Sequence, residues 1–361
     1  MPLPPDLLPP ALLPWADALR AALRAQQRPD LAAAALEALP DRGLAHVHLR
    51  LAGTGLLARL PKQSQLGLGA ADHLAYEAAC FARAQPGGHT PRLHATVAPT
   101  PALPRGALLV DEIVGRPAQL PDDLGALVDA LASLHVLPLP PALERAPLRD
   151  PADPLAALRA EIDAQAAHLG AAGLDAATRD RIDAERRAFD TVCAGLARPR
   201  RTLIAFDGHP GNFIVDGAGR AWLVDLEKAR YGYAALDLAH ATLYTSTTWD
   251  LASHAVLGAD DLLAACERWA ARVQADAGER RWIVPLRRAM WLWSITWCAK
   301  WRAVSADAPH AGDSGGEDWS TALSDDALVA HVRERVDHYL SREIVERVSD
   351  EAAALDVALA R

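Results

Sequence analysis

The amino-acid sequence predicts an α+β protein with two lobes. A small lobe with an antiparallel sheet, residues 35–114, is followed by a larger, mostly helical lobe, residues 115–361. The chain of 361 residues is longer than one ordinary hydrophobic core and suits two lobes or two domains. Alanine and leucine exceed valine, isoleucine, phenylalanine and tyrosine, which favours helix over sheet. Strand-like segments gather within residues 41–115, whereas most of the later sequence has helical spacing.

The beginning of the chain is predicted to be a helical extension, residues 1–34. Residues 1–14 are rich in proline, and the segments WADALRAALRAQQ and PDLAAAALEAL then have the spacing of two helices. The second helix is expected to begin at Pro29, because proline followed by an acidic residue is typical of a first helical turn.

The small lobe is predicted from a hairpin, a helix and two further strands. Residues 46–51 alternate apolar and polar side chains, and a glycine-containing turn separates them from a second strand at 56–60. Residues 70–84 have apolar side chains spaced along one helix face. Residues 91–99 and 107–115 are the remaining strand candidates, so this region has the elements of a small sheet.

The larger lobe is predicted to be helical around one small hairpin. A strong helix is expected at 123–137, and the highly charged segment 150–200 is expected to form helices with exposed charged faces. The apolar segments RTLIAF and WLVDLE are expected to pair as two short strands on either side of a polar loop. The rest is helical, except that residues 305–320 have the composition of a flexible acidic loop.

Composition argues against several classes of protein. The net charge is −9 and there is no basic block, which argues against a nucleic-acid partner and suits a cationic or neutral ligand better. The four cysteines are scattered, so neither a zinc site nor a disulfide framework is indicated. The sequence has no signal peptide pattern and no run of 18 apolar residues, so we expect a cytoplasmic protein without a membrane span.

Three polar residues between apolar segments carry the main chemical signal. Asn212 lies five positions after Asp207, and Asp225 lies thirteen positions after Asn212. Phosphoryl transfer needs a carboxylate to orient and deprotonate the attacking hydroxyl, and hard oxygen ligands to hold Mg²⁺ at the nucleotide phosphates. The spacing matches the D-x-x-x-x-N step of a kinase catalytic loop with a second metal-binding Asp downstream. Gly211 is expected to allow the tight turn between these residues.

The segments that hold these residues, DGHPGNFIVD and WLVDLEKARYGYAALDLAH, resemble the aminoglycoside phosphotransferase/choline kinase family of small-molecule kinases. That family usually has His-Gly-Asp-x-His-x-x-Asn at the catalytic loop and Ile-Asp-x-Glu at the metal strand. The resemblance implies a two-lobed protein-kinase-like fold. It also implies that Asp207 is the catalytic base and that Asn212 and Asp225 are metal ligands.

The resemblance assigns further residues and exposes one departure. It implies that Glu227 is an additional acid near the metal, that His209 is the loop histidine, and that Asp237 ties down the following helix. Ala205 and Phe206 stand where the family has His-Gly. Because the family's histidine braces the loop and is not the base, we expect other groups to hold the loop here.

The small lobe contains segments that resemble the nucleotide site of the family. In LLARLPK, Arg59 is the first choice, and Lys62 the second, for the basic residue that holds the α- and β-phosphates. Glu77 resembles the helix acid that pairs with this residue. Glu112 and Ile113 resemble the hinge that binds adenine through its backbone. The covering loop, DRGLAHV, has one glycine and differs from the glycine-rich loop of relatives.

Simpler explanations remain open for single residues. Asp207, Asn212 and Asp225 could each belong to a capped turn or a helix cap, although their joint spacing between apolar strands favours the chemical role. His209 could be a satisfied loop histidine. Glu77 could be a solvated helix acid, and Arg59 could extend from a strand edge with its charged end in water.

The function implied by the resemblance is transfer of the γ-phosphate of ATP, with Mg²⁺, to a hydroxyl of a small molecule. Aminoglycosides, choline or other amino alcohols, sugars and vitamin alcohols all remain candidate acceptors. The departures at Ala205 and Phe206, with the glycine-poor loop, leave a pseudokinase that binds nucleotide or a partner as the alternative. A protein Ser/Thr kinase is disfavoured because Asp225 is followed by Leu-Glu and the chain has no clear A-P-E segment.

Two features of the later sequence admit a ligand-binding and a plain structural explanation. Trp293, Trp297 and Trp301 repeat every four residues and share one helix face. Together with Trp291 they could form a cation–π box for a quaternary ammonium group, but helical spacing favours core packing. The acidic segment 305–320 could cover a cationic substrate, although a solvated loop is the simpler expectation.

Overall fold

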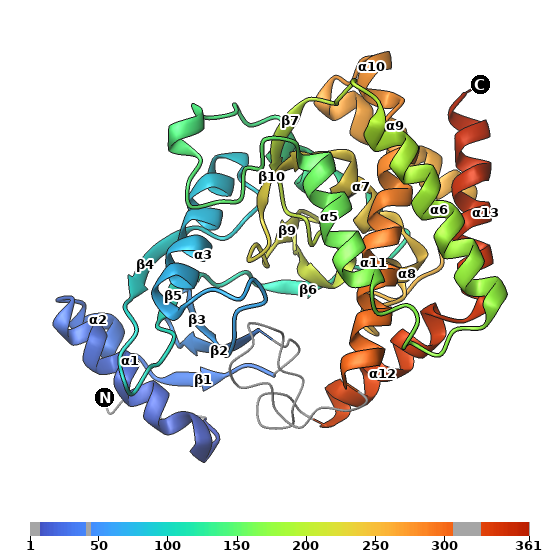
Figure 1. Ribbon diagram of the computed structural model, residues 1–361. Helices are drawn as coiled ribbons and strands as arrows, with labels where there is room; N and C mark the ends of the chain where they lie inside the picture. The colour runs from blue at the N-terminus through green and yellow to red at the C-terminus, as the bar shows by residue number, and fades with distance from the viewer. Residues whose placement is uncertain (1–7, 41–44, 306–325, 361) are drawn as a thin grey trace. The chain divides into compact units, whose positions relative to one another are not determined.

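The computed structural model describes residues 8–40, 45–305 and 326–360. The chain divides into two compact units. The first contains Met1–Gln85 and Pro91–Ile113, with Pro309–Ala330 grouped with it. The second contains Pro86–Thr90, Val114–Ala308 and His331–Arg361. The predicted α+β class is confirmed, because the first unit has an antiparallel sheet and the second is mostly helical (Figure 1).

The first unit is built on a five-stranded antiparallel sheet with the order β1-β2-β3-β5-β4. The neighbouring strands β3 and β5 are buried along nearly their whole length, whereas the other three strands are only partly buried. The predicted hairpin is present and joins β2 to β3. The strands are β1 (Leu36–Ala38), β2 (His46–Leu51), β3 (Leu56–Pro61), β4 (Leu93–Val97) and β5 (Ala107–Asp111).

The helices of the first unit share the core of this sheet. Leu19 and Leu23 of α1 are fully buried in one cluster with strand residues such as Leu49. The prediction of a long second helix up to residue 39 is wrong, because its end pairs with β2 as the edge strand β1. Backbone pairing at an open sheet edge outweighs the helix propensity of an alanine and leucine run. The helices are α1 (Leu13–Ala25), α2 (Pro29–Ala32) and α3 (Ala70–Ala84), with short 3-10 turns at Pro10–Leu12 and Gln85–Gly87.

The second unit contains two small sheets that hold the polar loop. β8 and β9 form a hairpin with β6 beside it, and β7 pairs with β10. The predicted pairing of RTLIAF with WLVDLE is therefore wrong. The tight turn after β8 brings the nearest following strand back onto it, so β9 pairs with β8 and leaves β7 to β10. The strands are β6 (Gly115–Pro117), β7 (Arg201–Ile204), β8 (Phe213–Asp216), β9 (Ala221–Leu223) and β10 (Arg230–Tyr233).

Helices form most of the second unit, and α11 is central among them because it packs against α5, α6, α7 and α13. The α-helices are α4 (Leu124–His135), α5 (Pro154–Ala166), α6 (Ala176–Ala194), α7 (Ala235–Thr242), α8 (Tyr244–Thr247), α9 (Ala259–Val273), α10 (Ala277–Arg280), α11 (Ile283–Ser305), α12 (Asp326–Tyr339) and α13 (Arg342–Leu359). Short 3-10 turns lie at Ala142–Glu144 and Pro210–Asn212. None of the described helices is long and apolar enough to cross a membrane.

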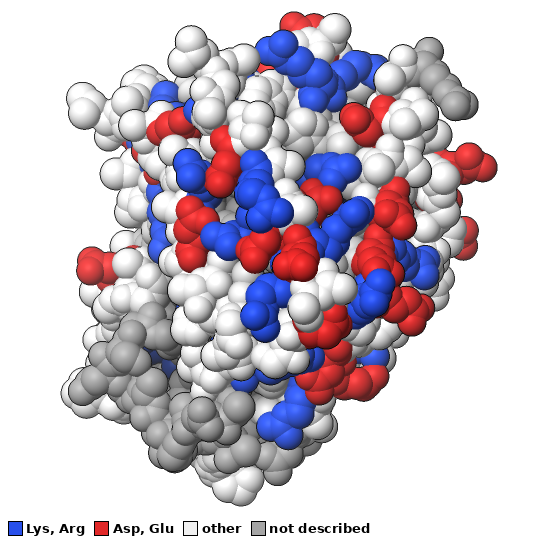
Figure 2. Space-filling view, turned by 45° about the vertical axis from the view of Figure 1, so that its right-hand side comes forward, with Lys and Arg blue, Asp and Glu red and all other residues white. Residues whose placement is uncertain are grey.

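The charged helices α5 and α6 carry interleaved ion pairs, as Arg159 with Asp190 and Arg186 with Asp163 illustrate. Figure 2 shows a face on which basic and acidic side chains are interspersed and neither sign forms a continuous patch. This arrangement suits the expected solvated faces.

The tryptophans of α11 divide between two environments. Trp291 and Trp301 are buried in the core, as expected from their helical spacing. Trp293 and Trp297 are half-buried, and Trp293 lies edge-on to the ring of Phe206. The acidic segment 305–320 lies outside the described residues from 306 onward.

Candidate active site

The predicted catalytic loop joins β7 to β8 in the second unit. The side-chain amide of Asn212 donates a hydrogen bond to the carbonyl of Asp207 at 2.8 Å. The carbonyl of Asn212 accepts a bond from the backbone N–H of Val224 at 3.0 Å, one residue before Asp225. The backbone thus links the three residues of the sequence motif within one compact unit, through the loop and the end of β9.

A buried carboxylate behind the loop replaces the brace that the sequence lacks. The side chain of Asp237, on α7, is fully buried and accepts bonds from the backbone N–H groups of Ala205 at 2.7 Å and Phe206 at 2.8 Å. It also accepts a hydrogen bond from Nε2 of His135 at 3.0 Å. Nδ1 of the same histidine accepts a hydrogen bond from the indole N–H of Trp269 at 3.1 Å. Every member has a partner, so the loop is tied to α4, α7 and α9 through fully paired polar groups.

Phe206 adopts a left-handed backbone conformation, with φ of 60°. Glycine adopts this conformation without the strain that a Cβ atom adds, and glycine is the residue that the resembled family has here. The strain is offset by packing: the Phe206 ring is buried, and the guanidinium carbon of Arg230 lies 3.7 Å from its centroid. Gly211 lies in the 3-10 turn Pro210–Asn212, where a tight turn was expected. Its φ is not positive, and glycine provides space there, because a Cβ atom would lie 2.9 Å from Cβ of Asp250.

Asp207 is surrounded by basic groups. Lys228 Nζ lies 2.8 Å from one carboxylate oxygen, and His240 Nδ1 lies 3.8 Å from the other. Burial raises the pKa of the Asp207 carboxyl, but Lys228 and the two histidines His209 and His240 outweigh burial, so the pKa lies below its usual range. The carboxylate is therefore ionised at every physiological pH, and its side chain is 15% exposed.

His240 is held neutral beside this carboxylate. Burial lowers the pKa of His240 to about 4, although the charge of Asp207 opposes this effect. Its ring lies 5.9 Å from that of His209, centroid to centroid. Two adjacent imidazolium groups would repel each other in this buried position, so the neutral form is favoured.

The donors that would hold a metal are oxygen atoms on the second unit. Asp225 accepts a weak bond from the backbone N–H of Glu227 at 3.4 Å, and a carboxylate oxygen of each lies within 4.8 Å of the other. Glu227 is buried. Asn212 is linked through its backbone carbonyl to Val224, the residue before Asp225, and its side-chain amide has an oxygen that could add to the two carboxylates. Two neighbouring carboxylates and an amide are hard ligands, which suit Mg²⁺.

The predicted phosphate-side residues of the first unit gather around a histidine that sequence reasoning missed. Nε2 of His46 donates to Glu77 at 2.6 Å, and Nη2 of Arg59 lies 3.4 Å from Nδ1 of His46. Burial raises the pKa of Glu77, but His46 and Arg59 outweigh it and lower the pKa. An ionised, buried Glu77 on α3 therefore faces basic residues of β2 and β3.

The other small-lobe candidates lie at backbone junctions. The N–H of Lys62 donates to the carbonyl of Ala45 at 2.7 Å, which continues the hairpin. The N–H of Glu112 donates to the carbonyl of Gly55 at 2.8 Å, and its carboxylate accepts from Arg50 at 2.5 Å. Because the backbone N–H of Glu112 is engaged, adenine at this hinge would be bound by the backbone of Ile113 or by the carbonyl of Glu112. Gly43 of the covering loop lies outside the described residues.

Sequence reasoning also missed Lys228 and His240. Lys228 follows Asp225 by three residues in the same motif, and a basic residue so close to the predicted metal ligand was the available signal. His240 lies one helical turn after Asp237 and so faces the same side of α7. Neither contact is visible in the sequence, since both depend on how β10 and α7 return to the loop.

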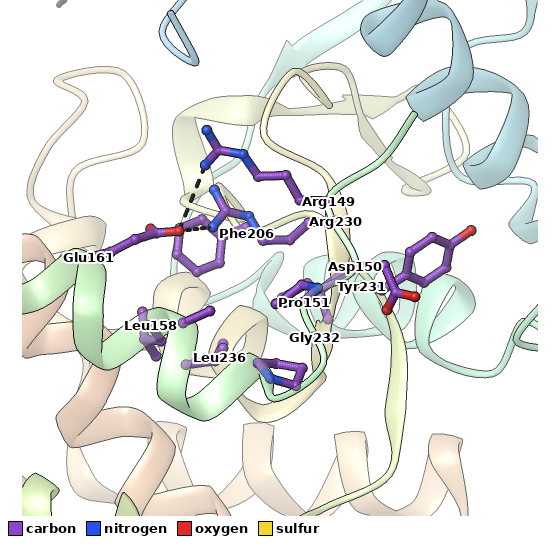
Figure 3. A pocket seen from close by; sticks show the side chains of 13 residues that line it. Arg149, Asp150, Pro151, Leu158, Glu161, Phe206, Arg230, Tyr231, Gly232 and Leu236 are labelled. Atoms are coloured by element: carbon purple, nitrogen blue, oxygen red, sulfur yellow. Dashed lines mark hydrogen bonds and ion pairs between the residues drawn. The ribbon is translucent and has the colours of Figure 1, made fainter. Parts of the chain in front are cut away.

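A pocket of about 330 Å³ opens beside the loop in the second unit (Figure 3). It lies among α5, the segment before it, β7, β10 and α7. Its wall contains apolar side chains, two arginines, two acids and the ring of Phe206. The lining residues are Arg149, Asp150, Pro151, Pro154, Ala157, Leu158, Glu161, Ile204, Phe206, Arg230, Tyr231, Gly232 and Leu236.

Solved structures of similar fold are numerous. A choline/ethanolamine kinase family protein from Mesorhizobium loti is 18% identical, with a TM-score of 0.54 over 93% of this chain and 99% of that one. A choline kinase from Cryptosporidium parvum is 12% identical, with a TM-score of 0.57 over 96% and 99%. A macrolide 2'-phosphotransferase from Brachybacterium faecium is 16% identical, with a TM-score of 0.52 over 87% and 97%. At these identities the likeness establishes the fold.

The family follows from the sequence itself. A comparison with curated protein sequences gives no significant match. The model of the phosphotransferase enzyme family APH matches residues 47–272, which is more than half of the chain and includes the catalytic loop and the metal strand. The chain therefore belongs to the APH phosphotransferase enzyme family and is a small-molecule phosphotransferase.

Proposed function

We propose that this enzyme transfers the γ-phosphate of ATP to a hydroxyl group of a small molecule in the cytoplasm, with Asp207 as the catalytic base. The observation that carries the proposal is the state of Asp207. It is an ionised, partly exposed carboxylate, held by Lys228, in a loop whose backbone N–H groups at Ala205 and Phe206 are bonded to Asp237. A carboxylate fixed in this way is suited to orient an incoming hydroxyl.

The proposed transfer involves the acceptor hydroxyl, the γ-phosphate of the nucleotide and Asp207. The acceptor hydroxyl donates a hydrogen bond to Asp207, and its oxygen attacks the γ-phosphorus. The bond between that phosphorus and the bridging oxygen breaks, its electron pair stays on ADP, and the hydroxyl proton passes to Asp207. The low pKa of Asp207 makes it a weak base, so the proton moves late, when the attacking oxygen has become strongly acidic.

Asn212, Asp225 and Glu227 have the donor set to hold Mg²⁺, which would offset the charge of the nucleotide phosphates. Lys228 restrains Asp207 through its 2.8 Å contact. It also keeps a positive charge close to where the transferred phosphoryl group would pass. Lys228 is thus expected to orient the base and to contribute to binding of the transferred group.

On the nucleotide side, we propose that Arg59 holds the α- and β-phosphates, with Lys62 as the second candidate. Glu77 orients Arg59 through His46, and the backbone around Glu112 and Ile113 binds adenine. Support comes from the buried chain of contacts between Arg59, His46 and Glu77, which keeps a guanidinium pre-positioned.

The departure at Ala205 and Phe206 motivates the alternative of a pseudokinase, but the loop is braced without the family's histidine. Asp237 binds both backbone N–H groups, and Phe206 keeps the left-handed conformation that the family reaches with glycine. This local compensation supports catalysis rather than loss of it.

The experiment is to incubate the purified chain with ATP and Mg²⁺ and a panel of hydroxylated metabolites while measuring ADP formation. At least one acceptor is expected to stimulate ADP release. Asp207→Asn should lower kcat by about 10²–10⁴-fold while nucleotide still binds. Near-normal turnover by this variant would overturn the base assignment. Nucleotide binding without turnover on any acceptor would favour the pseudokinase.

A further inference from the structure

The pocket beside Phe206 has an apolar side and a charged side. Figure 3 shows Leu158, Leu236 and Pro151 on one side and the charged ends of Arg149, Arg230 and Glu161 gathered on the other. Its volume of about 330 Å³ is at the lower end of the range for small-molecule sites. A small, amphipathic ligand fits this arrangement.

The charged side holds two guanidinium groups around one carboxylate. An oxygen of Glu161 lies 2.8 Å from Nη1 of Arg230 and 3.7 Å from Nη1 of Arg149. The other Glu161 oxygen accepts a bond from the indole of Trp293 at 3.2 Å. Glu161 therefore has partners on both oxygens, and the two guanidinium groups beside it offset its charge toward an ammonium group.

The second acid of the wall is also occupied by arginines. Asp150 contacts Arg145 at 3.0 Å and Arg201 at 2.5 Å through its two carboxylate oxygens. The wall alone is balanced, with two guanidinium groups and two carboxylates, and the two arginines that pair with Asp150 make four guanidinium groups beside two carboxylates. Although the whole chain is acidic, the local balance is positive.

The pocket borders the reaction centre through a short series of contacts. Phe206, which lines the pocket, directly precedes Asp207 and lies edge-on to Trp293 at 5.2 Å between ring centroids. Lys228 Nζ lies 6.0 Å from the Trp293 ring centroid and contacts Asp207. A ligand in the pocket would therefore lie against the residue next to the base.

We propose that this pocket binds the acceptor and that the acceptor carries an oxyanion, a carboxylate or a phosphate, held by Arg149 and Arg230. This inference rests on the proposed function for the presence of an acceptor, and it adds the acceptor's charge. Net charge alone favoured a cationic acceptor, whereas the arginines around the pocket, two in its wall and two paired with Asp150, favour an anionic one. The apolar side would contact the carbon skeleton, and the hydroxyl would extend toward Asp207. Guanidinium groups bind both oxyanions through paired N–H donors.

The test uses four three-carbon alcohols that differ in charge: glycerate, glycerol 3-phosphate, glycerol and 3-aminopropane-1,2-diol. Binding to the full chain is measured by saturation-transfer NMR and calorimetry without nucleotide, and ADP formation is measured with ATP and Mg²⁺. We expect glycerate, glycerol 3-phosphate or both to bind. Glycerol and 3-aminopropane-1,2-diol, the neutral and cationic probes, should bind at least tenfold more weakly. The preferred member of the first two tells whether the site selects carboxylate or phosphate.

Two variants and a matched control assign the effect to the pocket. Arg149→Met should weaken binding of the anionic probe by about 10- to 100-fold, the range of a charge-assisted hydrogen bond. Glu161→Gln removes the carboxylate that competes for the two arginines, so it should tighten binding of the anionic probe. Arg159→Met is the control, because Arg159 is on α5, is 46% exposed and pairs with Asp190, but does not line the pocket. It should change binding less than twofold.

The outcomes separate this inference from the proposed function. Phosphorylation of neutral or cationic alcohols without a response to the anionic ones would overturn the inference and leave the proposed function standing. Anion binding that depends on Arg149, without ADP formation, would support the pocket and count against the proposed function. No anion binding, or equal loss in Arg149→Met and Arg159→Met, would also overturn the inference.

Discussion

Two carboxylates lie at the loop 205–212: Asp237 packs behind it and Asp207 belongs to it. They differ in burial and in how completely their oxygens are hydrogen-bonded. At the back, Asp237 is fully buried and accepts three hydrogen bonds from two backbone N–H groups and a histidine. At the front, Asp207 is partly exposed and has Lys228 and His240 beside it. Asp237 is closed to a ligand because its side chain is fully buried, whereas the side chain of Asp207 is 15% exposed.

This difference suits two roles at one loop: the buried carboxylate supports the backbone, and the partly exposed one is accessible to a substrate. A saturated buried carboxylate fixes the backbone, and its removal leaves donors without acceptors. A carboxylate near mobile or titratable cations can exchange partners when a substrate arrives. The surroundings of an acid, and not its residue type, therefore indicate which role it has.

The largest expected effect is on the supporting side. Asp237→Asn replaces one acceptor oxygen by an NH₂ group that faces a backbone N–H, so we expect a loss of about 3–5 kcal/mol in the free energy of unfolding. Chemical denaturation measures it. Asp207→Asn is the comparison and should lose no more than about 2 kcal/mol. Equal losses would remove the distinction between the two carboxylates.

The next effect concerns His240 on the front side. Its folded pKa of about 4 lies below the usual value, so the unfolded chain binds a proton that the folded chain does not. Its contribution to stability is complete above about pH 6.5 and decreases as pH falls toward 4, by about 2–3 kcal/mol. His240→Gln should flatten the pH dependence of unfolding in this window. An unchanged slope would contradict the buried neutral state.

A smaller effect is expected at Lys228. Because Lys228 lowers the pKa of Asp207, Lys228→Met should raise it. Activity that needs the carboxylate is lost as pH falls through its pKa, so the acidic limb of kcat/KM should move to higher pH, with about a tenfold lower kcat at neutral pH. A pH–rate profile with an unmoved acidic limb would show that Lys228 does not act on the base.

The smallest effect extends the comparison to the first unit. Glu77 is buried like Asp237 and is also bonded to a histidine, but it lies near Arg59. Glu77→Gln should weaken nucleotide binding about five- to tenfold and change unfolding by about 1 kcal/mol. Calorimetry with ADP and Mg²⁺ tests this. A loss of stability as large as that of Asp237→Asn would place Glu77 with the supporting carboxylates.

Much of the fold was predictable because local patterns determine it. The helix at 70–84 and the hairpin from His46 follow from apolar spacing, and the Asp207–Asn212 step follows from the needs of phosphoryl transfer. The pairing of β7 with β10 was not predictable, since it depends on which partner is left after a nearer hairpin forms. The contact of Lys228 with Asp207 and the contact of His46 with Glu77 also depend on tertiary packing, each within its own unit, so their positions in the sequence gave little sign of a role.

The strained backbone at Phe206 joins two properties that evolve separately in many enzymes. Its ring forms a wall of the candidate acceptor pocket, while its peptide N–H is one of the two backbone groups by which Asp237 fixes the segment next to Asp207, the proposed base. A smaller side chain there would widen the room for new acceptors and relax the segment that aims Asp207. Substrate range and catalytic rate should therefore change together whenever position 206 mutates.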